Sequence, residues 1–154
     1  MTLDLEVSTE VSDRIAEIGR SVVVPKRLTR EECTTPVLRL EYIAQWLERE
    51  APPANGVDAF NMLAIASKTD CGTACCIAGA ACVWFGNSIY DFENSFDAAR
   101  LLGLEGEDRR TMFFASRLDE TVADLGKITP AWAARCIRKY QREGIVDWEG
   151  TRTP

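Results

Sequence analysis

The residues best suited to do chemistry lie in one apolar stretch, which holds four of the chain's six cysteines: Cys71, Cys75, Cys76 and Cys82. The small residues that follow predict a helix over about 74–85, capped by Thr73. Cys71 would then lie beside the positive end of the helix dipole, which lowers a thiol pKa, and Gly72 would leave room for a substrate. If the protein is an enzyme, Cys71 is the predicted nucleophile.

The composition argues against that chemistry. The sequence contains no histidine, which excludes Ser-His-Asp and Cys-His catalysis and every histidine-ligated metal site. The neighbouring Asp70 would also raise the pKa of the Cys71 thiol. The simpler interpretation is that the cysteines act as small buried hydrophobic residues, and we favour a protein that is not an enzyme.

Two kinds of binding site are further alternatives at this segment. Zinc would take Cys71 with Cys75 or Cys76, completed by one of the remaining cysteines, but paired Cys-x-x-Cys motifs are absent. An anion would bind the backbone amides at the expected helix start, at Gly72, Thr73 and Ala74. No phosphate-binding loop accompanies these amides, and we predict no cofactor and no metal.

The surrounding pattern is helical. Helices are expected over 8–22, from a Thr35 cap to just before Ala51, and over 74–85, 95–102, 106–116 and 130–143, with no convincing strand. This predicts an all-α fold, a compact bundle of five or six short helices around the small-residue helix at 74–85. The chain is expected to be a single domain, with frayed tails at 1–7 and 149–154.

Three groups of side chains are candidates for an interaction surface. The last helix carries a basic stripe at i, i+3, i+4 and i+7, made of Arg135, Arg138, Lys139 and Arg142. An acidic ridge precedes it in the chain, at Glu105, Glu107 and Asp108, and Trp148 lies in a polar tail. The stripe is either a solvated helix face or a docking strip for an acidic partner, and Trp148 either folds back or anchors an interface.

Charge and cysteine usage restrict the partner and the compartment. The net charge of −6 disfavours nucleic acid and anionic membranes as partners. The uncharged run 71–90 is too rich in glycine and small polar residues for a membrane span. Clustered cysteines and an acidic N-terminus without a signal-peptide pattern predict a cytoplasmic protein. The oligomeric state is left open.

Several motifs between about residues 37 and 143 resemble an uncharacterised family of small bacterial and phage proteins. They are Phe60-Asn61-Met62, Cys71-Gly72-Thr73, Cys76-Ile77-Ala78-Gly79, Leu101–Leu104, and Ile128-Thr129-Pro130 with Ala133-Ala134. This chain departs from the pattern at Ala80, where the family often carries a bulkier residue or histidine, and by its extra Cys75. The resemblance implies a compact domain of bacterial or phage source and supplies no activity.

Together these features predict a small acidic, non-enzymatic interaction protein that binds another protein. By analogy with phage-borne proteins, the target would be a host defence or regulatory protein, met in the host cytoplasm. The alternative is a cysteine-dependent enzyme, or a binder of a small ligand or anion, built around Cys71-Gly72-Thr73.

Overall fold

The structure is a computed structural model, and it describes residues 26–62, 66–69, 72–86, 95–115 and 125–154. The expected helix at 8–22 and the expected tail at 1–7 lie outside these ranges. The elements are η1 (Arg30–Glu32), α2 (Pro36–Glu48), β1 (Ala59–Phe60), β2 (Ala66–Thr69), β3 (Gly72–Cys75), α3 (Ile77–Phe85), α4 (Ser95–Leu102), α5 (Gly106–Phe114), η3 (Leu125–Lys127) and α6 (Pro130–Glu143). The expectation of a mostly helical protein is confirmed.

Local signals set the ends of the two longest described helices. Thr35 caps α2, its hydroxyl accepting a hydrogen bond from the amide of Leu38, and Pro36 occupies the first turn. Thr129 and Pro130 do the same for α6, where the Thr129 hydroxyl accepts from the amide of Trp132. Gly144 ends α6 at φ +70°, a left-handed conformation that glycine adopts without steric cost.

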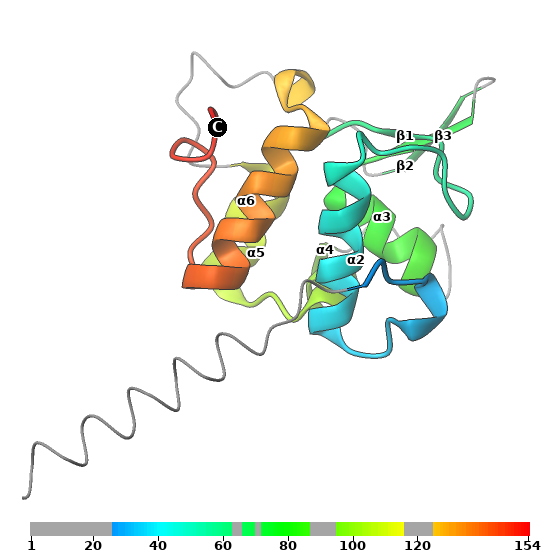
Figure 1. The fold of residues 1–154 in the computed structure, drawn as a ribbon, viewed down its shortest axis with the longest axis horizontal. Coiled ribbons are helices and arrows are strands. Elements are labelled where there is room, and N and C mark those ends of the chain that lie inside the picture. The colour runs from blue at the N-terminus through cyan, green and yellow to red at the C-terminus, as the bar shows by residue number, and fades with distance from the viewer. Residues whose placement is uncertain (1–25, 63–65, 70–71, 87–94, 116–124) are drawn as a thin grey trace, which may run out of the picture.

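Helix α2 lies between α6 and α3 in Figure 1, and it packs against α3, α4 and α6. Its residues Ile43, Trp46 and Leu47 are fully buried, together with Ile77 of α3 and Ile137 of α6. We expected the helix at 74–85 to hold the central position; among the described helices, α2 and α4 each pack against three others, and α3 packs against α2 and α4. Helix α2 carries larger apolar residues than the alanines and glycine of α3, so each of them buries more apolar surface.

A small sheet was not expected from the sequence. β3 is its middle strand, parallel to β1 and antiparallel to β2. The predicted helix at 74–85 therefore begins only at Ile77, and its cap is Cys76 instead of Thr73. The strands are two to four residues long, too short to show the alternation that identifies a strand in sequence. No helix in the described part of the chain is long and apolar enough to cross a membrane.

The C-terminal strap, Asp147–Arg152, folds back along α6. The Thr151 hydroxyl donates to the carbonyl of Asp147 (2.6 Å), and the amide of Gly150 donates to the Asp147 carboxylate (2.8 Å). The Arg135 guanidinium donates to the carbonyl oxygens of Thr151 and Arg152, both at 2.8 Å. Residues 149–152 are therefore held against α6, in place of the frayed tail expected for 149–154.

Candidate functional site

The expected anion site at the cysteine segment does not have the geometry that the prediction required. Gly72, Thr73 and Ala74 lie in β3, whose backbone pairs with Thr69, Lys68 and Ser67 of β2. These residues lie in the strand, three or more positions before the first residue of α3, so their amides are not the free amides of a helix N-terminus. Cys71 lies outside the described residues.

The described thiols are buried or half-buried, and all are weakly acidic. Cys33, Cys75, Cys76 and Cys136 are buried and Cys82 is half-buried, and all five are free. Burial is the main cause that raises the pKa of each thiol, to about 11 for Cys33 and Cys82 and to about 12 for Cys136. Thiols with these pKa values are almost fully protonated at neutral pH, so they are poor nucleophiles. Within the described residues, no group of three or more metal-ligating side chains is assembled.

The Cys76 side chain has a structural task. Its sulfur accepts a hydrogen bond from the amide of Gly79 (3.4 Å) and so caps α3. The residue is 3 % exposed, and burial raises its pKa despite that bond. Cysteine occupies a position that Ser, Thr, Asp or Asn usually fills.

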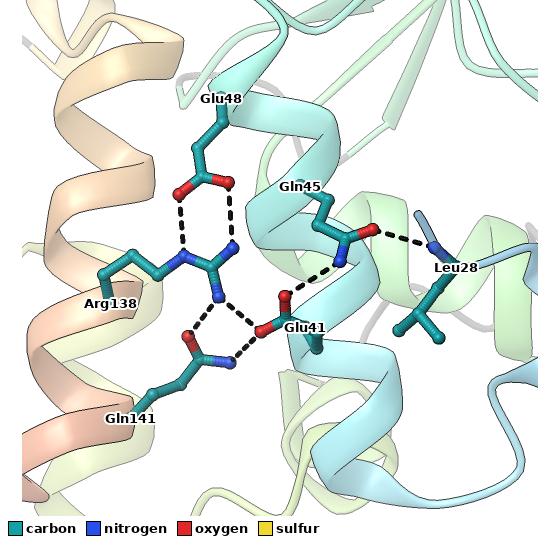
Figure 2. A network of polar contacts seen from close by, with 6 residues as sticks. All are labelled: Leu28, Glu41, Gln45, Glu48, Arg138 and Gln141. Atoms are coloured by element: carbon teal, nitrogen blue, oxygen red, sulfur yellow. Dashed lines mark hydrogen bonds and ion pairs between the residues drawn. The ribbon is translucent and has the colours of Figure 1, made fainter. Parts of the chain in front are cut away.

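The basic stripe of α6 is largely occupied by contacts within the chain. Arg138 makes a two-point contact with Glu48 of α2, with nitrogen-to-oxygen distances of 2.7 and 2.8 Å, and it also donates to Glu41 (Figure 2). Gln141 donates to the same Glu41 oxygen at 2.9 Å. This paired geometry is the strong form of an arginine–carboxylate interaction.

The network continues beyond α2. The other oxygen of Glu41 accepts from the Gln45 amide (3.0 Å), whose own oxygen accepts from the backbone amide of Leu28 (2.9 Å). Burial alone would raise the pKa of Glu41, but the hydrogen bonds and charge of Arg138, with the bond from Gln141, lower it overall. The hydrogen bonds from Arg138 to Glu48 likewise raise the pKa of Arg138 against its burial.

The other members of the stripe differ in their use. Lys139 pairs with Asp147 at 2.7 Å, and its pKa is raised chiefly by that hydrogen bond. Arg135 holds the C-terminal strap, whereas Arg142 is exposed and forms no ion pair with another described residue. A groove of about 590 Å³ runs beside the stripe, and it is lined by the four cations together with Glu48 and Glu143. Glu41 and Asp147, which pair with Arg138 and Lys139, do not line it. Among the described residues, three of the four cations in the stripe are therefore engaged in contacts within the chain, and Arg142 is the one that is not.

The acidic ridge lies at the start of α5, beside a depression between α4 and α5. Glu105 and Glu107 are exposed, and the negative charges of Asp108 and Glu105 add to burial in raising the pKa of Tyr140 on α6. The depression has a volume of about 400 Å³ and is lined by Phe96, Ala99, Arg100, Gly103, Leu104, Glu105, Gly106 and Arg109. The guanidinium of Arg109 lies 3.8 Å from the centre of the Phe96 ring.

Sequence analysis missed Phe96 as a surface residue. In the helix predicted over 95–102, Phe96 is spaced at i, i+3 and i+6 with Ala99 and Leu102, which is the spacing of one apolar face, yet it is 61 % exposed. The buried arc of α4 is centred on Ala98, Ala99 and Leu102, and Phe96 falls at its edge because each helical residue turns by about 100°. A helical-wheel projection of residues 95–102 would have separated Phe96 from the buried residues of this helix.

Trp148 is buried, so it is no exposed anchor. Only 2 % of its surface is exposed, and it packs at 6.0 Å, edge to face, against Trp132 of α6. Of the two alternatives for Trp148, the structure shows the one in which the tail folds back.

Comparisons with protein-family models, with curated proteins and with solved structures found no match for this chain. The resemblance drawn from its motifs therefore stays a prediction, and the arguments that follow rest on the chain's own residues.

Proposed function

We propose that this protein is a small, acidic interaction protein without catalytic activity, and that it binds another protein through the α4–α5 surface. The α4–α5 surface consists of the depression between α4 and α5, which is lined by Phe96 and Arg109 among others, and of the adjoining acidic ridge, Glu105, Glu107 and Asp108. The observation that carries the proposal is the 61 % exposure of Phe96 beneath the Arg109 guanidinium, at the edge of a depression.

This pair has the chemistry of an interface centre. Aromatic residues and arginine are enriched at the buried centres of protein interfaces, and a few such residues contribute most of the binding free energy. Burying the exposed part of one phenylalanine side chain is worth about 1–2 kcal/mol. The acidic ridge beside it would orient the partner and make association depend on salt.

The other candidate surfaces support binding less well. Arg135, Arg138 and Lys139 of the basic stripe are engaged by carboxylates and carbonyl groups of the same chain. The described thiols are protonated, and all but the half-buried Cys82 are buried. A partner at the basic stripe would have to displace these contacts, whereas the Phe96 ring is already exposed to solvent. The bacterial or phage character, and a host defence or regulatory protein as the target, remain part of the proposal through the resemblance alone.

Capture from bacterial lysate tests the proposal when two matched variants are compared by quantitative mass spectrometry. Phe96→Ala removes the ring from the depression, and Phe114→Ala removes another exposed ring, 48 % exposed, that does not line it. We expect a set of proteins whose capture falls about tenfold with Phe96→Ala and is unchanged with Phe114→Ala, since about 1.4 kcal/mol corresponds to tenfold in affinity.

Two outcomes would overturn the proposal. One is that Phe96→Ala captures the same proteins as the wild-type chain in the same amounts. The other is that both variants lose capture equally. Circular dichroism and thermal unfolding show whether each variant is folded, and substitutions of exposed side chains are expected to change stability by about 0.5 kcal/mol or less.

A further inference from the structure

The buried Trp148 joins two helices that are far apart in the chain. Its indole N–H donates to the carbonyl of Thr111 in α5 at 2.6 Å. Its own carbonyl accepts a hydrogen bond from the indole N–H of Trp132 in α6 at 2.8 Å. A single residue near the C-terminus therefore connects α5 to α6 through two directional contacts.

The C-terminal strap gives Trp148 a fixed position on α6. Asp147, the preceding residue, pairs with Lys139, and Arg135 binds the carbonyls of Thr151 and Arg152. These contacts lie on both sides of Trp148, so the indole is held from either direction along the chain. The Thr151 hydroxyl, whose shorter bond goes to the carbonyl of Asp147, also lies 3.3 Å from the carbonyl of Trp148, so its single proton is shared between the two.

Helix α5 carries the residues that form one wall of the α4–α5 surface. Arg109 is two residues before Thr111, and the acidic ridge lies at the start of the same nine-residue helix. Met112 and Phe113 bury α5 against the core, but apolar contacts have no preferred direction. A hydrogen bond has a preferred length and angle, so the Trp148 indole fixes where Thr111 lies along and around the helix axis.

We infer that Trp148 is a positioning residue for the α4–α5 surface. By fixing α5 at Thr111, it places Arg109 over the Phe96 ring and sets the acidic ridge beside the depression. The inference rests on the proposed function for the role of that surface, and on the hydrogen bonds alone for the placement of α5. It also assigns a task to the C-terminal strap, which holds the indole.

Hydrogen exchange measured by mass spectrometry tests the placement of α5. Trp148→Phe keeps an aromatic ring in the core and removes the indole N–H that donates a hydrogen bond to the Thr111 carbonyl. Trp46→Phe is the matched control, because Trp46 is also fully buried and its indole donates to a carbonyl, that of Pro52, at 2.8 Å. We expect the amides of α5 to exchange about fivefold faster in Trp148→Phe and to be unchanged in Trp46→Phe, from the loss of one hydrogen bond.

The inference is overturned if α5 exchanges at the wild-type rate in Trp148→Phe, or if both variants accelerate it equally. A second measurement tests the role of the α4–α5 surface. The amount of partner protein captured from lysate by Trp148→Phe should fall toward the amount captured by Phe96→Ala. Full capture by a variant with a loosened α5 would refute the positioning role. If Phe96→Ala itself captures normally, the proposed function fails, while the exchange rates still decide whether Trp148 places α5.

Discussion

Arg138 ties α6 to two carboxylates of α2, and replacing it by methionine measures how much the fold depends on this network (Figure 2). Methionine keeps much of the aliphatic length and removes the guanidinium. Glu48 then loses its paired partner, and Glu41 retains only the hydrogen bonds from Gln45 and Gln141. The two carboxylates are buried to different extents, so losing the contact with Arg138 lowers the unfolding free energy by a different amount for each.

The larger cost comes from Glu41. Its side chain is 12 % exposed, and removing one partner of a buried ion pair costs about 3–5 kcal/mol. The remaining bonds from two amides and the 27 % exposure of Arg138 reduce this to about 2 kcal/mol. The Glu48 side chain is 43 % exposed, and such a pair contributes about 0.5 kcal/mol. The total of about 2.5 kcal/mol corresponds to a fall of about 5–10 °C in Tm for a chain of this size.

Urea and thermal unfolding of Arg138→Met and Arg142→Met give the measurement. Arg142 lies one turn further along α6, is exposed and pairs with no other described residue, so its loss should change the unfolding free energy by about 0.5 kcal/mol or less. The reasoning is refuted if the two variants are equally stable. It is also refuted if Glu48→Gln costs more than Glu41→Gln, because burial is what makes the Glu41 contact valuable.

Three further predictions use single substitutions or reagents. The pKa of Glu41 is lowered in the fold, so its contribution to stability is present above the unfolded pKa of about 4.3 and is lost as pH falls through the folded pKa. Urea unfolding between pH 6 and 3 should therefore show a shrinking difference in unfolding free energy between wild type and Glu41→Gln, and a constant difference would contradict this. In Cys71→Ser, an aromatic disulfide reagent at pH 8 should modify the four buried thiols only as fast as the protein unfolds, and the half-buried Cys82 is the one described thiol that can react sooner; a burst of more than one thiol per chain with the native protein would show that burial does not protect them. Gly144→Ala places a side chain at φ +70° with no atom within 4 Å of the new Cβ, so it should cost about 1 kcal/mol in thermal unfolding from backbone strain alone, and an unchanged Tm would refute that account.

The helices predicted best are those whose first and last residues are determined by residues within one turn of the helix end. A threonine followed by proline predicts the starts of α2 and α6, because capping and the missing proline N–H act within one turn. Gly103 and Gly144 predict the ends of α4 and α6, and both have positive φ. None of these signals requires knowledge of what the helix packs against.

The cysteine segment was predicted least well because its structure depends on pairing with other segments. Thr73 has the sequence features of a helix cap, yet it pairs with Lys68 of β2. Strand pairing is decided by a partner elsewhere in the chain, and a four-residue strand carries too few positions to show a period of two. The predicted start of α3 was wrong for this reason, and the amides expected to form an anion site at a helix start lie in β3 for the same reason, since both expectations took Thr73 as a helix cap.

The basic stripe shows why the spacing of charges alone does not identify a docking surface. Positions i, i+3, i+4 and i+7 place four cations on one face of α6, but they do not say whether the opposing carboxylates belong to a partner or to the same chain. In the described structure the partners are Glu41 and Glu48 on α2, about 90 residues earlier, and Asp147 just beyond the helix. These carboxylates pair with Arg138 and Lys139, whereas Arg135 binds the carbonyl groups of Thr151 and Arg152. The contacts of Arg135, Arg138 and Lys139 are therefore made within the fold, whereas Phe96, whose ring lies beneath the Arg109 guanidinium, remains 61 % exposed.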